Sequence, residues 1–153
     1  MVTNNSLQWH SFFRGLNSEQ LSAVSLAAKE ITCEKGELLF AEDAPANMLC
    51  LLVEGGVDLF CLTEGKDARL RELAVGAITS GEAFGLSALI EPHIYRAGAR
   101  ASARSRVLTV DAEKLRALCA ADGELACHLI SRVAETAMER LYSTQVQLAG
   151  EEI

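Results

Sequence analysis

A glycine loop and a nearby arginine, both between Gly81 and Ala101, are the residues whose types and spacing could do chemistry. The loop contains Phe84-Gly85 and opens a short segment of small and apolar residues, and Arg96 follows in the next segment. Such a loop can point backbone N–H groups at an anion where it starts a short helix, and a buried arginine adds a charge-assisted contact to a phosphate. Whether these residues bind a ligand, and which one, depends on the elements that position them.

The histidines and cysteines are not arranged as a metal or catalytic centre. His10, His93 and His128 stand outside any H-E-x-x-H motif, so we expect solvated histidines on loops or on a helix face. The cysteines form no C-x-x-C pair and are odd in number, which indicates reduced thiols, and the first three lie in apolar segments as small core residues. The five are Cys33, Cys50, Cys61, Cys119 and Cys127.

Catalysis is not expected either. The sequence has no Ser-His-Asp or Cys-His pairing at motif level, and no two of its acidic residues stand out as a catalytic pair. We therefore predict a protein that is not an enzyme and has no resident metal or cofactor. One alternative stays open: Cys127-His128 and His93 could ligate a haem in a haem or redox sensor, although nothing in their spacing demands it.

The composition is that of one acidic domain. Half of the 153 residues are apolar, enough for a single domain over 1–153 that buries roughly two thirds of its unfolded surface. The formal charge of −7 argues against an autonomous nucleic-acid binder, which presents a basic face. Met1 to Gln8 are polar and no run is long enough to span a bilayer, so we expect a cytoplasmic protein with no membrane or direct nucleic-acid partner.

The spacing of apolar residues changes along the chain, and it predicts the helices and strands that would position the glycine loop. Asn17-Ser-Glu-Gln20 is typical of a helix capping box and predicts a helical segment over 12–30. From 31 to 111, short apolar runs alternate with turn residues, which predicts an antiparallel β-barrel or sandwich. The predicted strands include Leu38–Phe40, Met48–Val53, Val57–Leu62, Leu70–Val75 and Val107–Val110.

Helical period returns over 112–148. We predict a short helix over Ala112–Ala120 and a longer one from about Gly123 to Leu148. Two heptad series on the longer helix form a narrow seam of small and medium side chains. The seam packs either on the barrel of the same chain or on the same helix of a second copy in a parallel homodimer, and both alternatives stay open. It consists of Cys127, Ala134, Leu141 and Leu148 in one series and Ile130, Ala137 and Thr144 in the other.

The order of these elements and several local motifs resemble a known family. Gly36-Glu-Leu-Leu-Phe40 matches its turn-and-strand opening, and the run from Met48 to Val57 matches its apolar strand and glycine turn. Phe84-Gly85 with Ser87-Ala88-Leu89 matches the start of its phosphate cassette. On these residues, the stretch from about Phe12 to Leu148 is similar to the cyclic-nucleotide-binding domain of catabolite-activator and Fnr-type regulators.

The resemblance implies a fold and a class of function. The fold is mainly β with flanking helices: an antiparallel double-stranded β-helix, that is, an eight-stranded jelly-roll barrel, followed by a long C-terminal helix. The function is that of a non-enzymatic, ligand-sensing regulatory domain. In full-length regulators of this family a DNA-reading helix-turn-helix follows the long helix, whereas only Gly150 to Ile153 follow here. We therefore expect a stand-alone sensor domain that acts on an unknown protein effector.

The same resemblance implies which residues would bind a ligand. Leu86 stands where the family has a glutamate that accepts the ribose 2′-hydroxyl, and a leucine accepts nothing. Aligned backward from the strand Val107–Val110, Tyr95 stands at the position of the phosphate-binding arginine, with Arg96 one place beyond. Thr144 stands where the long helix of the catabolite activator touches adenine. The full set is Phe84, Gly85, Leu86, Ser87, Ala88, Tyr95, Arg96, Ala97 and Thr144.

A one-residue step matters here because it moves a strand side chain to the opposite face. One parity holds Tyr95, Ala97, Ala99, Ala101 and Ala103, and the other holds Arg96, Arg100, Arg104 and Arg106. The period-two rule predicts that the small residues face the interior and that the arginines form a solvated face balanced by acidic residues. In the alternative, a bulge or a loop one residue longer turns Arg96 into the pocket.

Two further hypotheses of function therefore stay open in addition to the haem or redox sensor. In the first, cyclic AMP or another small anion binds between the cassette Phe84–Ala101 and the long helix and shifts that helix between two packings. In the second, the domain is a degenerate, ligand-free homodimeric interaction module.

Overall fold

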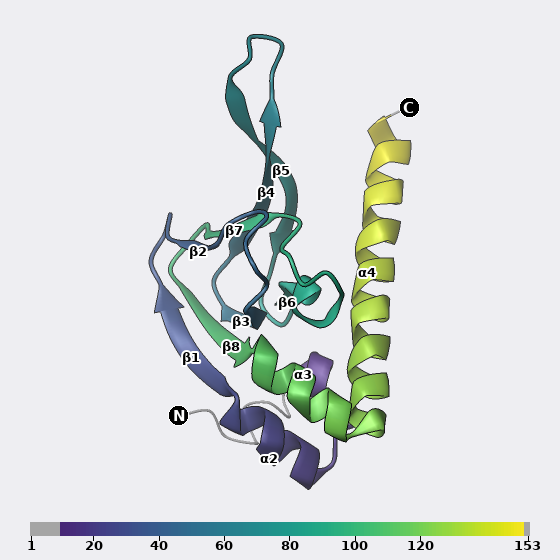
Figure 1. The fold of residues 1–153 in the computed structure, drawn as a ribbon. Coiled ribbons are helices and arrows are strands. Elements are labelled where there is room, and N and C mark those ends of the chain that lie inside the picture. Colours follow the sequence, from purple (N-terminus) through teal and green to yellow (C-terminus); the bar gives the residue numbers. More distant parts are fainter. Residues whose placement is uncertain (1–9, 152–153) are drawn as a thin grey trace.

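The structure, a computed structural model, describes residues 10–151 (Figure 1). Helices stand at both ends of a β-rich middle, in the order that the change of sequence period predicts. The helical elements are η1 (Ser11–Phe13), α2 (Ser18–Leu26), η2 (Leu86–Leu89), α3 (Ala112–Ala121) and α4 (Gly123–Glu151). The strands are β1 (Ala28–Cys33), β2 (Leu38–Phe40), β3 (Met48–Glu54), β4 (Val57–Glu64), β5 (Leu70–Ile78), β6 (Ala83–Phe84), β7 (Gly98–Ala101) and β8 (Ser105–Asp111).

The described strands form two antiparallel sheets of four strands each. One sheet has the order β1-β8-β3-β6 and the other the order β2-β7-β4-β5. This arrangement confirms the predicted jelly roll with flanking helices and a long C-terminal helix. The expected closed barrel is wrong in one respect, because the described strands pair within two separate sheets and not around a continuous ring.

The core lies between the sheets and under the helices. Leu49, Leu51 and Leu52 on β3 are fully buried, as are Val107 on the neighbouring strand β8 and Val57 on β4 of the other sheet. Strand β3 is buried on both faces because its inner face meets the opposite sheet while α3 and η2 pack near it. That position explains why its sequence is a continuous apolar run and not an alternating one.

The N-terminal helix begins where the sequence predicts and ends earlier. Asn17 and Gln20 form the predicted capping box, with each side chain accepting a hydrogen bond from the other's backbone N–H. The prediction of helix up to residue 30 is wrong, since α2 ends at Leu26. The next residues instead pair with β8, beginning with Ala28 opposite Val110, so the β-rich part starts at 28 and not at 31.

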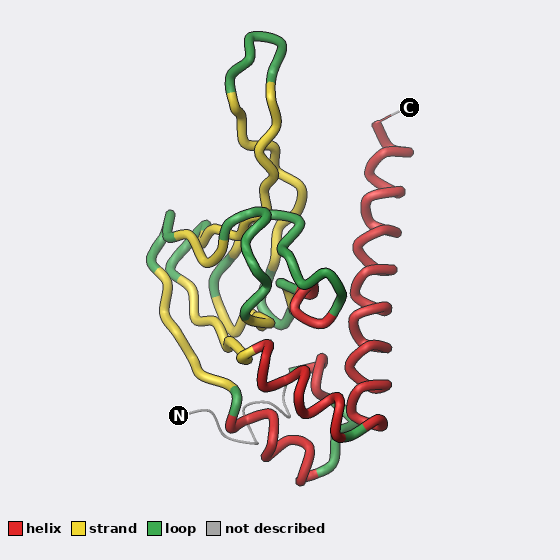
Figure 2. Tube along the Cα trace, in the orientation of Figure 1, coloured by secondary structure: helices red, strands yellow, loops and turns green. Residues whose placement is uncertain are grey.

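The β4–β5 hairpin projects beyond the rest of the sheets (Figure 2). Strand β5 is exposed along its length up to Ile78, which is buried. The apolar side chains of Leu62, Leu70, Leu73 and Val75 are each about half exposed or more. The five predicted strands are confirmed, whereas β6 and β7, which flank the glycine loop, were not predicted as separate strands.

The long helix α4 stands at the side of the sheets (Figure 1). Its buried residues are Leu125, Leu129 and Val133, which lie at helical spacing on one face. The seam predicted from the heptads lies elsewhere, because Ile130 is 43% exposed and Leu141 is 57% exposed. Packing of this seam on the same chain is therefore wrong, and the face is open. No helix within residues 10–151 combines the length and apolarity that a membrane span needs.

Candidate functional site

The glycine loop forms a tight turn between β6 and η2. Gly85 has φ 70°, in the left-handed region that favours glycine. A Cβ at Gly85 would lie 3.2 Å from the Met48 carbonyl oxygen and 3.4 Å from Cε1 of Tyr95, so the turn is closely packed on its inner side. Phe84 and Ala88 are fully buried, and Leu86 and Ser87 are half-buried. The structure thus brings the predicted site residues from Phe84 to Ala88 into one turn.

Tyr95 occupies the interior beside this turn. Its side chain is 3% exposed and its ring stacks on Phe40, with 3.7 Å between the ring centroids and 10° between the planes. Its hydroxyl donates to the carbonyl of Met48 at 2.7 Å and accepts from the N–H of Met48 at 3.1 Å. Burial raises the pKa of Tyr95 to about 12. The position that the resemblance assigns to a phosphate-binding arginine therefore holds a neutral, fastened phenol.

Arg96 points the other way. The residue is exposed, and its side chain forms no ion pair with any described residue. Its backbone carbonyl accepts a weak hydrogen bond from Sγ of Cys61 at 3.5 Å. The alternative in which a longer loop turns Arg96 into the pocket does not describe this structure. Ala97 is half-buried and carries no polar side-chain atom toward a ligand.

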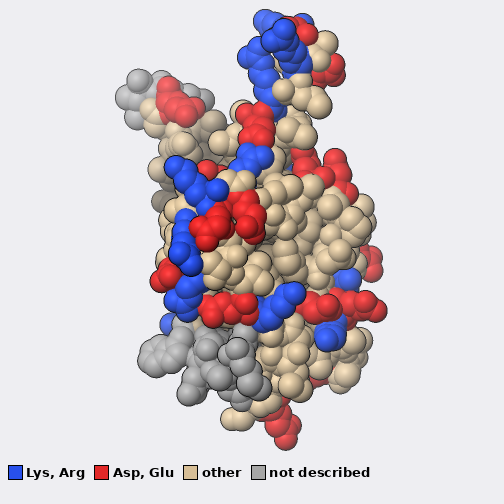
Figure 3. Space-filling view, turned by 90° about the vertical axis from the view of Figure 1, so that its left-hand side faces the viewer, with Lys and Arg blue, Asp and Glu red and all other residues tan. Residues whose placement is uncertain are grey.

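The other arginines of that parity lie on the surface beside carboxylates. Arg100 binds Glu72 with two hydrogen bonds of 2.7 and 2.9 Å and lies 4.5 Å from the Phe60 ring centroid. Arg104 pairs with Glu34 at 3.5 Å, and Arg106 pairs with Glu30 at 2.8 Å. Figure 3 shows basic and acidic side chains intermixed over this side of the molecule. The expected solvated face balanced by acidic residues is confirmed for these arginines.

A second part of the predicted site lies between α4 and the β4–β5 hairpin. A cleft of about 400 Å³ is lined by Thr144, by Arg140 one helical turn earlier, and by Leu59 and Gly76 from the hairpin. Arg140 donates through Nη2 to the carbonyl of Ala83 in β6, while its Nε has no hydrogen-bond partner although it is buried. Desolvation lowers the pKa of this guanidinium.

Sequence reasoning missed Arg140. A signal was available, because Arg140 precedes Thr144 by four residues and therefore lies on the same helix face. The Oγ1 of Thr144 also donates to the carbonyl of Arg140 at 2.9 Å. Thr144 thus lies beside the cleft with Arg140 and not beside the cassette residue Tyr95, which lines a different cavity.

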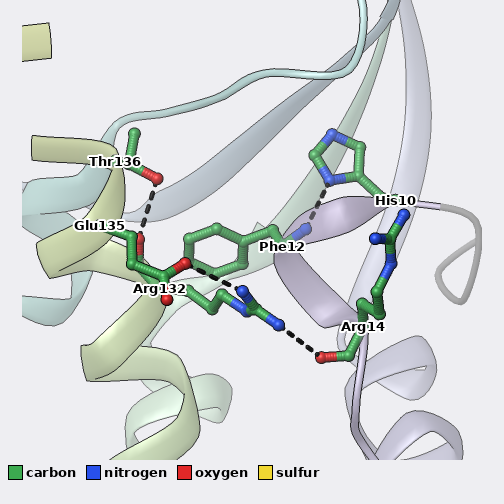
Figure 4. A network of polar contacts seen from close by, with 6 residues as sticks. All are labelled: His10, Phe12, Arg14, Arg132, Glu135 and Thr136. Carbon is green, nitrogen blue, oxygen red and sulfur yellow. Dashed lines mark hydrogen bonds and ion pairs between the residues drawn. The ribbon is translucent and has the colours of Figure 1, made fainter. Parts of the chain in front are cut away.

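A hydrogen bond from Arg132 joins the N-terminal turn to α4 (Figure 4). The guanidinium of Arg132 donates to the carbonyl of Arg14 at 3.2 Å and to the Glu135 carboxylate at 2.9 Å. His10 caps η1 by accepting from the N–H of Phe12, and its Nε2 is buried without a partner. Burial lowers the pKa of His10 to about 4. The expectation that His10 is solvated is wrong, because only 8% of the residue is exposed.

The remaining histidines and the cysteines do not gather into a centre. His128 on α4 lies against Gly15, and His93 lies in the loop between η2 and β7. Within residues 10–151 no group of three or more His, Cys, Asp or Glu could hold a metal ion. Cys33 and Cys50 are buried, as predicted for core residues, whereas Cys61 is half-exposed. Burial raises the pKa of the Cys33 thiol to about 11 and raises that of Cys50 further, which makes both poor nucleophiles.

Comparison with known proteins identifies relatives. A family model described as a cyclic nucleotide-binding domain matches residues 30–122. The crystal structure of a provisionally named cyclic nucleotide-binding protein from Geobacter metallireducens is 32% identical, with a TM-score of 0.82 over 92% of this chain and 99% of that one. The N-terminal domain of a transcriptional regulator from Streptomyces coelicolor is 25% identical, with a TM-score of 0.64 over 87% of this chain and 92% of that one.

A curated relative is much longer than this chain. It comes from Rhodopseudomonas palustris, its name assigns it provisionally to the potassium channels, and it is 32% identical over 101 residues. Those residues make up 66% of this chain and 23% of that protein. The chain therefore spans about a quarter of the length of this relative.

Proposed function

Because the chain belongs to the cyclic nucleotide-binding domain family, we propose that it is a non-enzymatic regulatory domain whose cassette binds no cyclic nucleotide and whose output is carried by a homodimer. The first part of this proposal, that the cassette binds no cyclic nucleotide, depends mainly on the position of Tyr95. A phosphate in a family-type cassette needs a cation and a free space beside the glycine turn. Here the phenol ring of Tyr95 occupies that space. Its hydroxyl already donates a hydrogen bond to the Met48 carbonyl and accepts one from the Met48 N–H.

The Leu86 side chain supports the same conclusion. A ribose 2′-hydroxyl buried beside this leucine would lose the acceptor that water provides, at a cost of roughly 1–3 kcal/mol. That cost corresponds to about one to two powers of ten in affinity. The loss of the cation adds to it, because Arg96 faces solvent on the opposite side of the chain from Tyr95.

The homodimer half of the proposal is supported by the open face of α4. Ile130, Leu141 and Leu148 lie in the heptad seam and are 43%, 57% and 57% exposed. Ala134 and Ala137 lie between them and are exposed as well, so two helices could approach closely along this line. Exposed apolar side chains gathered along one line of a helix mark an interaction surface. A second copy of the chain presents the matching stripe under twofold symmetry.

A second candidate function is favoured by the cleft that holds Arg140 and Thr144. The buried Nε of Arg140 has no partner, and an anion in the cleft would provide one. In this version a small anion binds at α4 and not at the cassette, and it competes with the Ala83 carbonyl for the guanidinium. Glu82 and Glu139, which line the same cleft, oppose an anion there, so this candidate ranks second.

Two measurements on one sample test the proposal. Calorimetric titration with cyclic AMP and cyclic GMP should give no saturable heat at millimolar nucleotide, while sedimentation equilibrium should show a dimer. Saturable heat that survives Arg140→Met would overturn the cassette half of the proposal. Heat that disappears in Arg140→Met would establish the second candidate, and a monomer at all concentrations would overturn the dimer half.

A further inference from the structure

A larger cavity lies beside the Phe40–Tyr95 stack and away from the α4 cleft. Its volume is about 660 Å³, within the range of roughly 300–1,000 Å³ that small-molecule sites occupy. It is bordered by the end of α2, the start of β1, the loop between β2 and β3, and the start of α3. Strands β1 and β2 lie on the side of the molecule opposite α4 (Figure 1). The cavity shares no lining residue with the cleft that contains Thr144.

The floor of this cavity is apolar. Phe40, Met48 and Tyr95 line it, and the polar atoms among its buried lining residues are already bonded. The Tyr95 hydroxyl is held by Met48, and Oγ1 of Thr109, a residue only 2% exposed, donates to the carbonyl of Lys29 at 3.4 Å. A ligand body with polar groups would therefore find few partners there, whereas an alkyl or aryl body would remove apolar surface from water.

The rim of the cavity carries a different chemistry. Lys29 and Lys114 line it, and neither forms an ion pair with a described residue. The carboxylate of Asp111 also lines it, but its Oδ1 is engaged as the N-cap of α3, accepting from the N–H of Lys114. The rim therefore has two lysine ammonium groups and one carboxylate that already accepts a hydrogen bond, and this balance of charge favours a ligand with an anionic group. Leu26, 84% exposed at the same rim, extends the apolar surface outward.

From this combination we infer that the cavity binds a small amphiphilic monoanion, a carboxylate with an unbranched alkyl or an aryl body. The body lies on the Phe40–Tyr95 stack, and the carboxylate lies between the Lys29 and Lys114 ammonium groups. Because both rings of that stack also lie against the Gly85 turn, a ligand on the stack would contact residues that pack against the cassette turn. This inference goes beyond the proposed function and does not depend on whether the cassette binds a nucleotide.

The probe is decanoate below its micelle concentration, followed by NMR of methionine methyl groups. Met48 lines the cavity, whereas Met138 lies 69% exposed on α4 and reports unspecific binding to the open helix face. The expected result is a saturable shift of the Met48 signal with little change at Met138. The cationic analogue decyltrimethylammonium should not compete. A shift confined to Met138, or no saturable shift at Met48, would overturn the inference.

Matched double variants test the role of the rim lysines. Lys29→Met with Lys114→Met should weaken decanoate binding about tenfold, since each partly exposed ion pair contributes less than about 1 kcal/mol. Lys35→Met with Lys66→Met changes the net charge equally at exposed positions outside the cavity and should leave the affinity unchanged. Equal affinity in both double variants would contradict the proposed anionic head group. Should the first variant fold poorly, the comparison of decanoate with decyltrimethylammonium on the natural chain decides the point.

Discussion

The Tyr95 hydroxyl and the backbone of Met48 exchange two hydrogen bonds, one donated by the hydroxyl at 2.7 Å and one accepted by it at 3.1 Å. This exchange fastens the segment after the cassette turn to the first residue of β3. The ring is clamped as well, since it stacks on Phe40 and lies against Gly85. A side chain held from three sides is a structural element of the core, and the proposed function assigns to it the space that a bound phosphate would need.

Removing the Tyr95 hydroxyl should destabilise the protein. Tyr95→Phe keeps the stacked ring but leaves the carbonyl and N–H of Met48 without their side-chain partner, which costs about 1–3 kcal/mol. The measurement is urea denaturation at neutral pH. Tyr142→Phe, at a position 68% exposed, is the matched control and should leave the free energy of unfolding unchanged. Equal stability of the two variants would show that the Met48 contacts contribute nothing.

Alkaline pH should weaken the natural chain through the same residue. The pKa of Tyr95 is raised to about 12 in the folded state, so the folded chain favours the neutral phenol more than the unfolded chain does. This stabilisation is complete below the ordinary tyrosine pKa near 10 and is lost as the pH rises from about 10 to about 12. Denaturation curves across this window should show a steeper loss for the natural chain than for Tyr95→Phe. Parallel losses would contradict the assignment.

Acid pH should act through His10. Its pKa is lowered to about 4 by burial, so the folded state excludes the proton that the unfolded state binds. The resulting stabilisation is complete above the ordinary histidine pKa of about 6.5 and is lost as the pH falls toward about 4. In His10→Gln the free energy of unfolding should fall less over this window than in the natural chain. Carboxylates titrate in both proteins, so the difference between the curves isolates His10, and identical slopes would refute the prediction.

The open seam of α4 predicts which substitutions break a dimer. Leu141→Glu places a charge in the seam and should weaken self-association at least tenfold, because a buried carboxylate without a partner is strongly disfavoured. Val146→Glu is the matched control, since Val146 is 53% exposed and lies about 140° around the helix from Leu141. Sedimentation equilibrium compares the two. A dimer equally weakened by both would place the interface elsewhere on α4.

Restoring the family's polar residues should restore nucleotide binding. Leu86→Glu with Tyr95→Arg supplies an acceptor for the ribose hydroxyl and a cation for the phosphate in place of the phenol. Without nucleotide this variant should be less stable than the natural chain, because the arginine is buried without a partner. Cyclic AMP should raise its melting temperature, whereas Leu86→Glu alone should show no rise. If the double variant folds but cyclic AMP does not raise its melting temperature, these two positions do not decide binding.

Most of the fold could be predicted because its signals are local. The Asn17–Gln20 capping box depends on residues three apart, and the strands β2, β3, β4 and β8 are short apolar runs bounded by turns. The alternation of residue types also predicted that Tyr95 is buried and Arg96 exposed, although Arg96 and Ala97 form a bend before β7 and not part of a strand. Each of these features needs no knowledge of distant parts of the chain.

The features that could not be predicted depend on distant contacts. The helix α2 stops at Leu26 because the next residues pair with β8, about eighty positions later. His10 is buried beside residues of η1 and α4, and Arg140 reaches back from α4 to the carbonyl of Ala83. The burial of His10 has no local sequence signal. The helical spacing of Arg140 and Thr144 places both on one helix face, but only the folded chain shows the contact of Arg140 with Ala83.

The most direct test of the central claim follows the backbone amides of Gly85 and Leu86 by NMR while cyclic AMP is added to the natural chain. If the cassette binds no nucleotide, the chemical shifts of these two amides should not change at millimolar cyclic AMP, because the Tyr95 ring occupies the space beside them. Saturable shifts of both signals, with loss of the Tyr95–Met48 contact, would contradict the account.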